Sequence, residues 1–418
     1  MDELPIGRRV AYWRQRRKMS QQLFADQLGK SKSWVDKVER GVRRLDKFSV
    51  LYEIADVLHV DVQLLVGSEM HRKPDSLNCV DQVEVAEIRA ALENYDQVVA
   101  YFERPKVDQV PLEELQKAVC HSWAAFQHAK YGMVARSLPK LLRDAQGADA
   151  CYESDVSVVV GDGLRRVNAA HLLSQVYQIA ASVMRKLGEH ELGWLAADRA
   201  IGVSHRSGDQ LLVGVATTRL ANAMLALGRA RPALDLNVQV AHRLAPTTEA
   251  EATPERLSVY GHLLLQGAMA AARCGDLATS RDLLRAADEV AEGVDGDANH
   301  YWTVFGPTNV ALHRAAAAVD LGEHGIAVST HERIDPQAFG ALLPERRAHH
   351  LIDVSRAYTH MGNTDTAGEL LVEADRLAPS EIRCRPAAQE VMMGVLRRTK
   401  GSPAGQLSEL ADHLGVAV

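Results

Sequence analysis

The sequence predicts an all-α protein in two parts, a small N-terminal domain followed by a long array of helical hairpins. Residues 20–41 have the capping and apolar pattern of two short helices joined by a tight turn. Five glycines at near-regular spacing divide residues 167–378 into repeated helical segments. Val156–Val160 alone has the pattern of a strand, and five residues do not make a sheet by themselves.

The first predicted helix pair lies within Ser20–Gly41. Ser20 and Ser31 are candidate N-caps, because a serine hydroxyl accepts a hydrogen bond from the free amides of a helix's first turn. Gly29 supplies the positive φ that a tight turn requires. Apolar residues recur at helical spacing in both helices: Leu23, Phe24, Leu28, Trp34, Val35 and Val38. The outward face of the second helix is then free to enter a DNA major groove, which is about 12 Å wide.

This block resembles the XRE/Cro, or lambda-repressor-like, helix-turn-helix family. The matching residues are Met19, Ser20, Gln21, Ala25, Leu28, Gly29, Ser31, Val35, Val38, Glu39 and Gly41, followed by Leu51, Ile54, Ala55, Leu58, Val60, Leu64, Leu65 and Gly67. The resemblance implies five helices over residues 5–67 and binding to double-stranded DNA. It places Gln21 at a phosphate and brings Lys32, Ser33, Trp34, Asp36 and Lys37 to the DNA-facing helix. The alternative for Trp34 is packing against the first helix of its own domain.

Basic residues cluster around this block, in the first predicted helix and after the second: Arg8, Arg9, Arg14, Arg16, Arg17, Lys18, Arg40, Arg43 and Arg44. Residues 1–67 carry 13 Lys and Arg against 9 Asp and Glu, whereas the rest of the chain carries 35 against 45. We interpret several of these basic residues as phosphate contacts, the alternative being ordinary solvated charges. The negative balance of the remainder argues against a second large nucleic-acid surface.

Length and composition bound the rest of the chain. With 418 residues it has room for two or three domains, which we place at 1–67 (DNA binding), 68–83 (linker) and 84–418 (helical repeats). No apolar run approaches the roughly 20 residues of a membrane helix, so we expect a cytoplasmic protein with no membrane partner. The five scattered cysteines, with no Cys-x-x-Cys pair, are expected to be reduced.

The glycines that define the repeat are Gly188, Gly228, Gly275, Gly322 and Gly362, with spacings of 40, 47, 47 and 40 residues. Seven positions before each glycine stands a small residue: Ala181, Ala221, Ala268, Ala315 and Ser355. Five positions after each stands another: Gly193, Ala233, Ser280, Ala327 and Ala367. Small residues on both sides of a turn let two antiparallel helices approach closely, so the pattern predicts repeated helical hairpins.

These hairpins are similar to the tetratricopeptide repeat (TPR), although their spacing exceeds its usual period of about 34 residues. The resemblance implies a right-handed helical solenoid with a concave wall. The positions thirteen and six before each glycine would line it: Gln175, Val215, His262, Asn309 and His349, and Ser182, Asn222, Met269, Ala316 and Arg356. The positions nine before, one residue off the wall, are Ile179, Arg219, Gln266, His313 and Asp353.

Amide, imidazole and guanidinium groups on such a wall suit a polar small molecule or a peptide backbone. The ligand-binding candidates are Gln175, Arg219, Asn222, His262, Gln266, Asn309 and His349. The competing interpretation is that the inner face of a solenoid is polar only because it faces solvent.

A Cro-type domain joined to a TPR-like array looks like the peptide-sensing RRNPP regulators and the related helix-turn-helix regulators of actinomycetes. That resemblance implies a homodimer whose two DNA-binding domains occupy two half-sites and whose array senses a signal. Two alternatives stay open, an interaction scaffold tethered to DNA and a phage-type or plasmid-type repressor without a ligand.

No motif in the sequence supports catalysis or a cofactor. There is no Gly-x-Ser-x-Gly elbow, P-loop or His-Glu-x-x-His, and Gly161-Asp162-Gly163 lacks the rest of a nucleotide-binding fingerprint. The adjacent His349 and His350 cannot share one helical face, which disfavours a metal site there. We therefore expect a protein that is not an enzyme.

Overall fold

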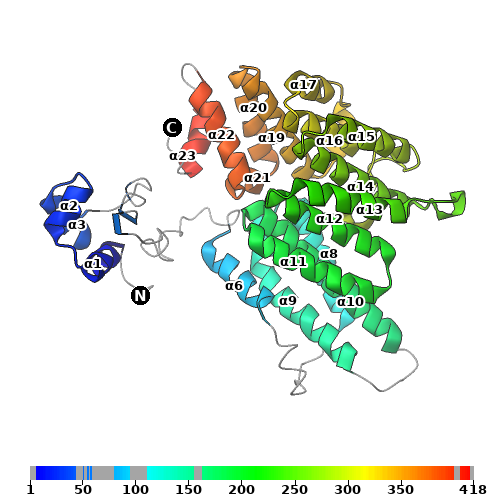
Figure 1. The fold of residues 1–418 in the computed structure, drawn as a ribbon, viewed down its shortest axis with the longest axis horizontal. Helices are drawn as coiled ribbons and strands as arrows, with labels where there is room; N and C mark the ends of the chain where they lie inside the picture. Colours follow the sequence, from blue (N-terminus) through cyan, green and yellow to red (C-terminus); the bar gives the residue numbers. More distant parts are fainter. Residues whose placement is uncertain are drawn as a thin grey trace. The chain divides into compact units, whose positions relative to one another are not determined.

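The computed structural model describes residues 6–43, 50, 54–55, 57–58, 80–94, 111–154, 162–399 and 405–414. All regular secondary structure in these ranges is helical, apart from one isolated bridge between Ala298 and Phe305, which confirms the all-α prediction (Figure 1). The chain divides into two units, residues 1–76 with 81–83 and residues 77–80 with 84–418. Several predictions lie outside the described residues: the role of Arg44, most of the fourth and fifth helices, the linker up to residue 79, Cys79 and the strand-like segment Val156–Val160.

The N-terminal unit contains α1 (Ile6–Arg16), α2 (Gln21–Gln27) and α3 (Lys32–Glu39). Ser20 accepts from the amide of Leu23 and Ser31 from that of Trp34, so both predicted caps are present. Gly29 has φ of +61° in the turn between α2 and α3. The buried apolar residues form one core: Val10, Phe24, Ala25, Leu28, Val35, Val38, Ile54, Ala55 and Leu58. The local signals that the sequence contains for α2, the turn and α3 are therefore all present in the structure.

The crossing of α1 and α3 depends on Gly7. A Cβ atom added there would lie 2.0 Å from the carbonyl oxygen of Val38, which belongs to the backbone of α3. No side chain can occupy that space, so the two helix backbones are in direct contact.

The second unit, here called the helical body, begins with α6 (Gln82–Leu92), α8 (Leu112–Gln127) and α9 (Tyr131–Ser154). Its central helices are α10 (Asp162–Leu187), α11 (His190–Ser204), α12 (Gln210–Ala226), α13 (Ala230–Leu244), α14 (Pro254–Arg273), α15 (Leu277–Ala291), α16 (Pro307–Asp320) and α17 (His324–Glu332). It ends with α18 (Pro336–Ala341), α19 (Pro344–His360), α20 (Thr364–Leu377), α21 (Pro379–Arg383), α22 (Pro386–Arg398) and α23 (Gly405–Leu414). Short 3-10 turns occur at His205–Ser207, Glu249–Glu251 and His300–Trp302.

The predicted hairpins are present. Each repeat glycine has a φ between +72° and +84° and joins two packed helices, giving the pairs α10/α11, α12/α13, α14/α15, α16/α17 and α19/α20. The predicted small residues meet across the hairpins, because Ser280 donates to the carbonyl of Ala268 at 3.0 Å and Ser355 to that of Ala367 at 2.9 Å. The two residues of each pair are the ones that the sequence places seven before and five after a repeat glycine.

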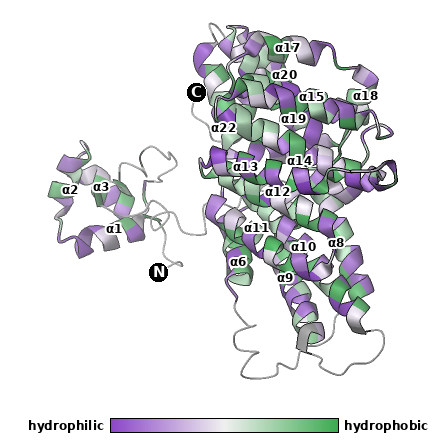
Figure 2. Cartoon of the chain, turned by 45° about the vertical axis from the view of Figure 1, so that its right-hand side comes forward, coloured by the Kyte–Doolittle hydropathy of each residue, from purple (hydrophilic) through white to green (hydrophobic). Residues whose placement is uncertain are grey.

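Hairpins stack through their first helices. Helices α10, α12, α14, α16 and α19 contact one another in that order and form what we call the inner row, which α22 continues (Figure 1). Apolar and polar residues mix along these helices (Figure 2), and none of the described helices is both long and apolar enough to span a membrane.

The two ends of this stack are joined. Helix α8 packs against α10 and also against α19. At the end of this helix, the Gln127 amide donates to Asn299 at 3.0 Å, and Trp123 stacks on Trp302 with ring centroids 5.9 Å apart. The Tyr131 hydroxyl, at the start of α9, donates to Glu381 of α21.

Candidate functional sites

The outer face of α3 is the candidate nucleic-acid interface. Val35 and Val38 are buried, whereas Lys32, Ser33 and Lys37 are exposed. Arg40 and Arg43, just beyond the helix, are also exposed. The helix is therefore held by its apolar side and leaves two lysines and a hydroxyl available to base edges.

Trp34 and Asp36 are less available than these residues. Trp34 is half-buried and packs against the core of its unit, with the guanidinium of Arg43 6.0 Å from its ring centroid. Asp36 pairs with Arg40 across one helical turn at 3.2 Å. The structure thus favours the packing role for Trp34, and Asp36 holds the Arg40 side chain along the helix.

A buried network ties the three helices together. Arg14 of α1 binds Glu39 of α3 through two hydrogen bonds, Nε to Oε1 at 2.5 Å and a terminal nitrogen to Oε2 at 3.0 Å. Gln21, at the start of α2, donates to the same Oε2 at 2.9 Å. Glu39 therefore orients Gln21, the residue predicted to contact a phosphate.

Two basic residues of the first helix are buried. Arg8 is exposed, whereas Arg14 is 8% exposed and bound to Glu39, and Arg9 is only 2% exposed. A side chain with so little exposed surface does not reach a duplex, so the structure contradicts the prediction that Arg9 contacts DNA.

The second candidate site is a cavity of about 830 Å³ on the inner row and α22. Most of the predicted wall lines it, including positions expected to lie one residue off: Arg219, Asn222, Gln266, Met269, Asn309, His313, Ala316, His349, Asp353 and Arg356. The other predicted positions do not line it: Gln175, Ile179, Ser182, Val215 and His262. Gln175 accepts a hydrogen bond from the indole of Trp302 at 3.1 Å, and His262 is 1% exposed behind the wall.

The cavity is basic although the body is acidic. Eight Lys and Arg residues line it against three Asp and Glu. Six of these cations stand at none of the positions that the sequence placed on the wall or one residue off it: Arg185, Lys186, Arg273, Arg346, Arg385 and Arg398. Arg185, Lys186 and Arg273 stand two or three positions before a repeat glycine. Aligning the repeats on their glycines and looking for basic residues at the same position would have found them.

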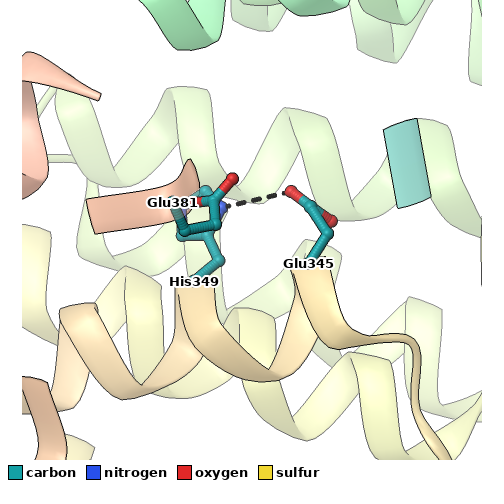
Figure 3. Close-up of side chains that lie close together, drawn as sticks. All are labelled: Glu345, His349 and Glu381. Atoms are coloured by element: carbon teal, nitrogen blue, oxygen red, sulfur yellow. Dashed lines mark ion pairs between the residues drawn. The ribbon is translucent and has the colours of Figure 1, made fainter. Parts of the chain in front are cut away.

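A buried acidic cluster lies behind this wall. Glu345 and His349 from α19 and Glu381 from α21 converge, with one potential ligand atom of each within 4.8 Å of the others (Figure 3). The Nζ atom of Lys186 lies 2.6 Å from Glu345, 2.6 Å from Glu381 and 3.2 Å from His349. These donors could hold a divalent cation only if that ammonium group left, so the internal lysine provides the positive charge that the cluster requires.

Burial and mutual attraction set the protonation of this cluster. Burial lowers the pKa of Lys186, and the charges of Glu345 and Glu381 oppose that effect. Burial by itself would raise the pKa of Glu345, but Lys186, Arg346 and His349 outweigh it and hold that pKa well below its usual value. The Lys186 ammonium and the two carboxylates are therefore close enough to form a buried ion-pair network.

Comparison with known proteins identifies the N-terminal unit alone. No curated protein and no solved structure matches the chain at a significant level. Residues 5–66 match the family model described as a helix-turn-helix domain, so this chain carries such a domain at its N-terminus.

Proposed function

We propose that this protein is a sequence-specific transcriptional regulator of the XRE type that contacts bases through Lys32, Ser33 and Lys37. The observation that carries the proposal is the exposed face of α3, held in place by buried Val35 and Val38 within a matched helix-turn-helix domain. Lysine donates to guanine edges in the major groove, and serine pairs with several bases. This function requires no chemistry beyond binding.

The test is a fluorescence anisotropy titration of the full chain with DNA from the promoter region beside its own gene. Lys32→Ala and Lys37→Ala should each reduce the preference for specific over unrelated DNA by about 1 to 3 kcal/mol. Arg8→Ala should weaken binding to all sequences alike, because a phosphate contact carries no base information.

Arg243, an exposed arginine on α13 of the helical body, provides the control variant Arg243→Ala, which should bind DNA as the parent does. Log K should fall by about 0.9 per phosphate contact as log salt rises. If the parent shows no sequence preference at any salt concentration, the proposal is wrong.

We also propose that the body is a TPR-like solenoid that pairs two copies of the chain. Its support is the repeated hairpin with small residues at fixed positions and the stacking of first helices into an inner row. One small DNA-binding domain touches few bases, whereas two tethered domains gain affinity through their effective concentration on two half-sites.

Light scattering coupled to size exclusion tests the pairing. We expect a mass of about twice the 45.8 kDa of one chain. A stable monomer that captures a protein partner would instead favour an interaction scaffold tethered to DNA.

The proposed signal site is the cavity of the inner row. Its volume of about 830 Å³ lies within the range of roughly 300 to 1,000 Å³ that is usual for ligand pockets. Because the cavity is built from successive hairpins, a peptide or small molecule bound there would favour one curvature of the stack. It would change DNA binding only by its difference in affinity between the curvatures.

A further inference from the structure

We propose that the cavity binds a small organic anion and that Arg185, Arg219 and Arg346, here called the basic triad, receive its carboxylate or phosphate group. The inference rests on the proposed signal site and adds the chemical class of the signal. It is carried by the placement of three guanidinium groups with too few carboxylates to neutralise them.

Arg219 is the centre of the argument. It lies on α12, lines the cavity and is 9% exposed. Among the described residues its side chain has no hydrogen bond or ion pair, and its guanidinium instead lies 5.3 Å from the ring centroid of Trp123. Burial, followed by repulsion from Arg346 and Arg185, lowers the pKa of Arg219 to about 9, so it stays charged at neutral pH. A buried charge without a counter-charge is costly, and an anion would relieve that cost.

Arg346 shares its one carboxylate partner with Lys186, and Arg185 has none among the described residues. Arg346 of α19 lies 3.5 Å from Glu345, whose carboxylate also forms an ion pair with Lys186 at 2.6 Å. Arg185 of α10 has no ion pair within the described part of the chain, and its pKa is lowered first by burial and then by Arg385.

Three other cations of the cavity each contact a carboxylate. Arg273 and Arg356 both contact Asp320, at 2.5 and 3.4 Å, and Arg385 contacts Glu381 at 3.1 Å. Among the described buried and half-buried cations of the cavity, the least compensated charge therefore lies at the triad, where residues of α10, α12 and α19 line the same space.

Polar neutral groups complete this part of the cavity. The side-chain amide of Asn222 has no hydrogen-bond partner in the residues that the structure describes. Asn222 lines the cavity one turn of α12 from Arg219. The Nδ1 of His313 lies 2.9 Å from the carbonyl of Asn309, which makes Nδ1 the protonated nitrogen of the neutral ring. Guanidinium groups bind carboxylate and phosphate in a bidentate fashion, and amides can contact the rest of an organic molecule.

Apolar side chains and volume argue for more than an inorganic ion. Leu225, Met269, Leu312, Ile352 and Val391 also line the cavity, whose volume of about 830 Å³ far exceeds that of one phosphate. The expected ligand has an apolar portion and at least one anionic group.

Isothermal titration calorimetry of the full chain with phenylacetate and with phenyl phosphate, which share an apolar ring and differ in the anionic group, tests the proposal at pH 7.5 and fixed ionic strength. We expect saturable binding of at least one probe, and the tighter of the two indicates whether carboxylate or phosphate is preferred. Arg219→Gln and Arg346→Gln should each weaken binding at least tenfold, whereas Arg243→Gln on the outer surface of α13 should leave it unchanged.

Thermal unfolding provides an independent readout. Arg219→Gln removes an unneutralised buried charge, so without a probe its Tm should equal or exceed that of the parent, and its Tm should no longer rise with the probe. Absence of saturable binding of both probes would overturn the proposal, and so would equal weakening by Arg243→Gln. DNA binding without a probe is measured on the same samples: if it is intact while anion binding fails, only the ligand class is wrong.

Discussion

Replacing Lys186 with methionine should lower the free energy of unfolding of the helical body by about 3 to 5 kcal/mol, the usual cost of removing one partner of a buried ion pair. The Lys186 and Glu381 side chains are fully buried, and the Glu345 side chain is 5% exposed. Methionine fills similar space but leaves two carboxylates without the ammonium that lay 2.6 Å from each. The measurement is urea unfolding at pH 7.5, followed by circular dichroism.

Lys140 offers a matched control, because its side chain is 76% exposed and pairs only across one turn of α9 with Asp144. Lys140→Met should change the free energy of unfolding by no more than about 0.5 kcal/mol. Adding Glu345→Gln to Lys186→Met should recover part of the loss, since it removes one of the two buried carboxylates that have lost their ammonium partner. A loss below about 1 kcal/mol in the Lys186→Met single variant would contradict the buried network.

Acidification from pH 6.5 to about 4 should destabilise the body by several kcal/mol. Burial and Arg346 lower the pKa of His313 to about 4, and burial with His331 and His313 lowers that of His350 to about 3. Burial, Arg219, Arg346 and His313 hold the pKa of His262 well below its usual value. The unfolded chain takes up these protons near pH 6.5 and the folded chain does not, so stability falls as the pH decreases.

Each such histidine contributes a slope of up to about 1.4 kcal/mol per pH unit, which for His313 amounts to about 3 kcal/mol in all. Urea midpoints at pH 7.5, 6.5, 5.5 and 4.5 measure it. Above pH 7 these histidines should contribute no pH dependence to the free energy of unfolding. His313→Gln can still donate to the carbonyl of Asn309. It should reduce the dependence of the unfolding free energy on pH between 6.5 and 4.5 by the contribution of one histidine, up to about 1.4 kcal/mol per pH unit. A parent profile that is flat down to pH 5 would rule out the neutral buried histidines.

The parts of the fold that the sequence predicted correctly are those encoded locally. The serine caps, Gly29 and the repeat glycines act within a few residues of their own position, and the serine pairs across the hairpins lie only 12 residues apart. Such contacts follow from helical spacing alone.

The parts that it missed depend on distant segments. Lys186 meets Glu345 and Glu381 across 159 and 195 residues, and no spacing rule predicts that encounter. Gln175 accepts a hydrogen bond from the indole of Trp302. In that segment Tyr301, Trp302 and Val304 have φ values between +50° and +62°. Residues of these types rarely adopt that conformation, so the sequence contains no turn signal there. Arg9 was misplaced because charge by itself does not show which side of α1 the rest of the domain covers.

The bond between Tyr131 and Glu381, with α8 lying against both α10 and α19, has a consequence for cooperativity. In an open chain of repeats each unit touches only its neighbours, so the ends can fray or be deleted one at a time. Here α8 and the start of α9 also contact α19 and α21, so removing the segment from α19 onward would remove contacts of the beginning of the body as well. We therefore expect the helical body to unfold in one cooperative transition. A change of curvature at its centre would then alter the packing at both ends together.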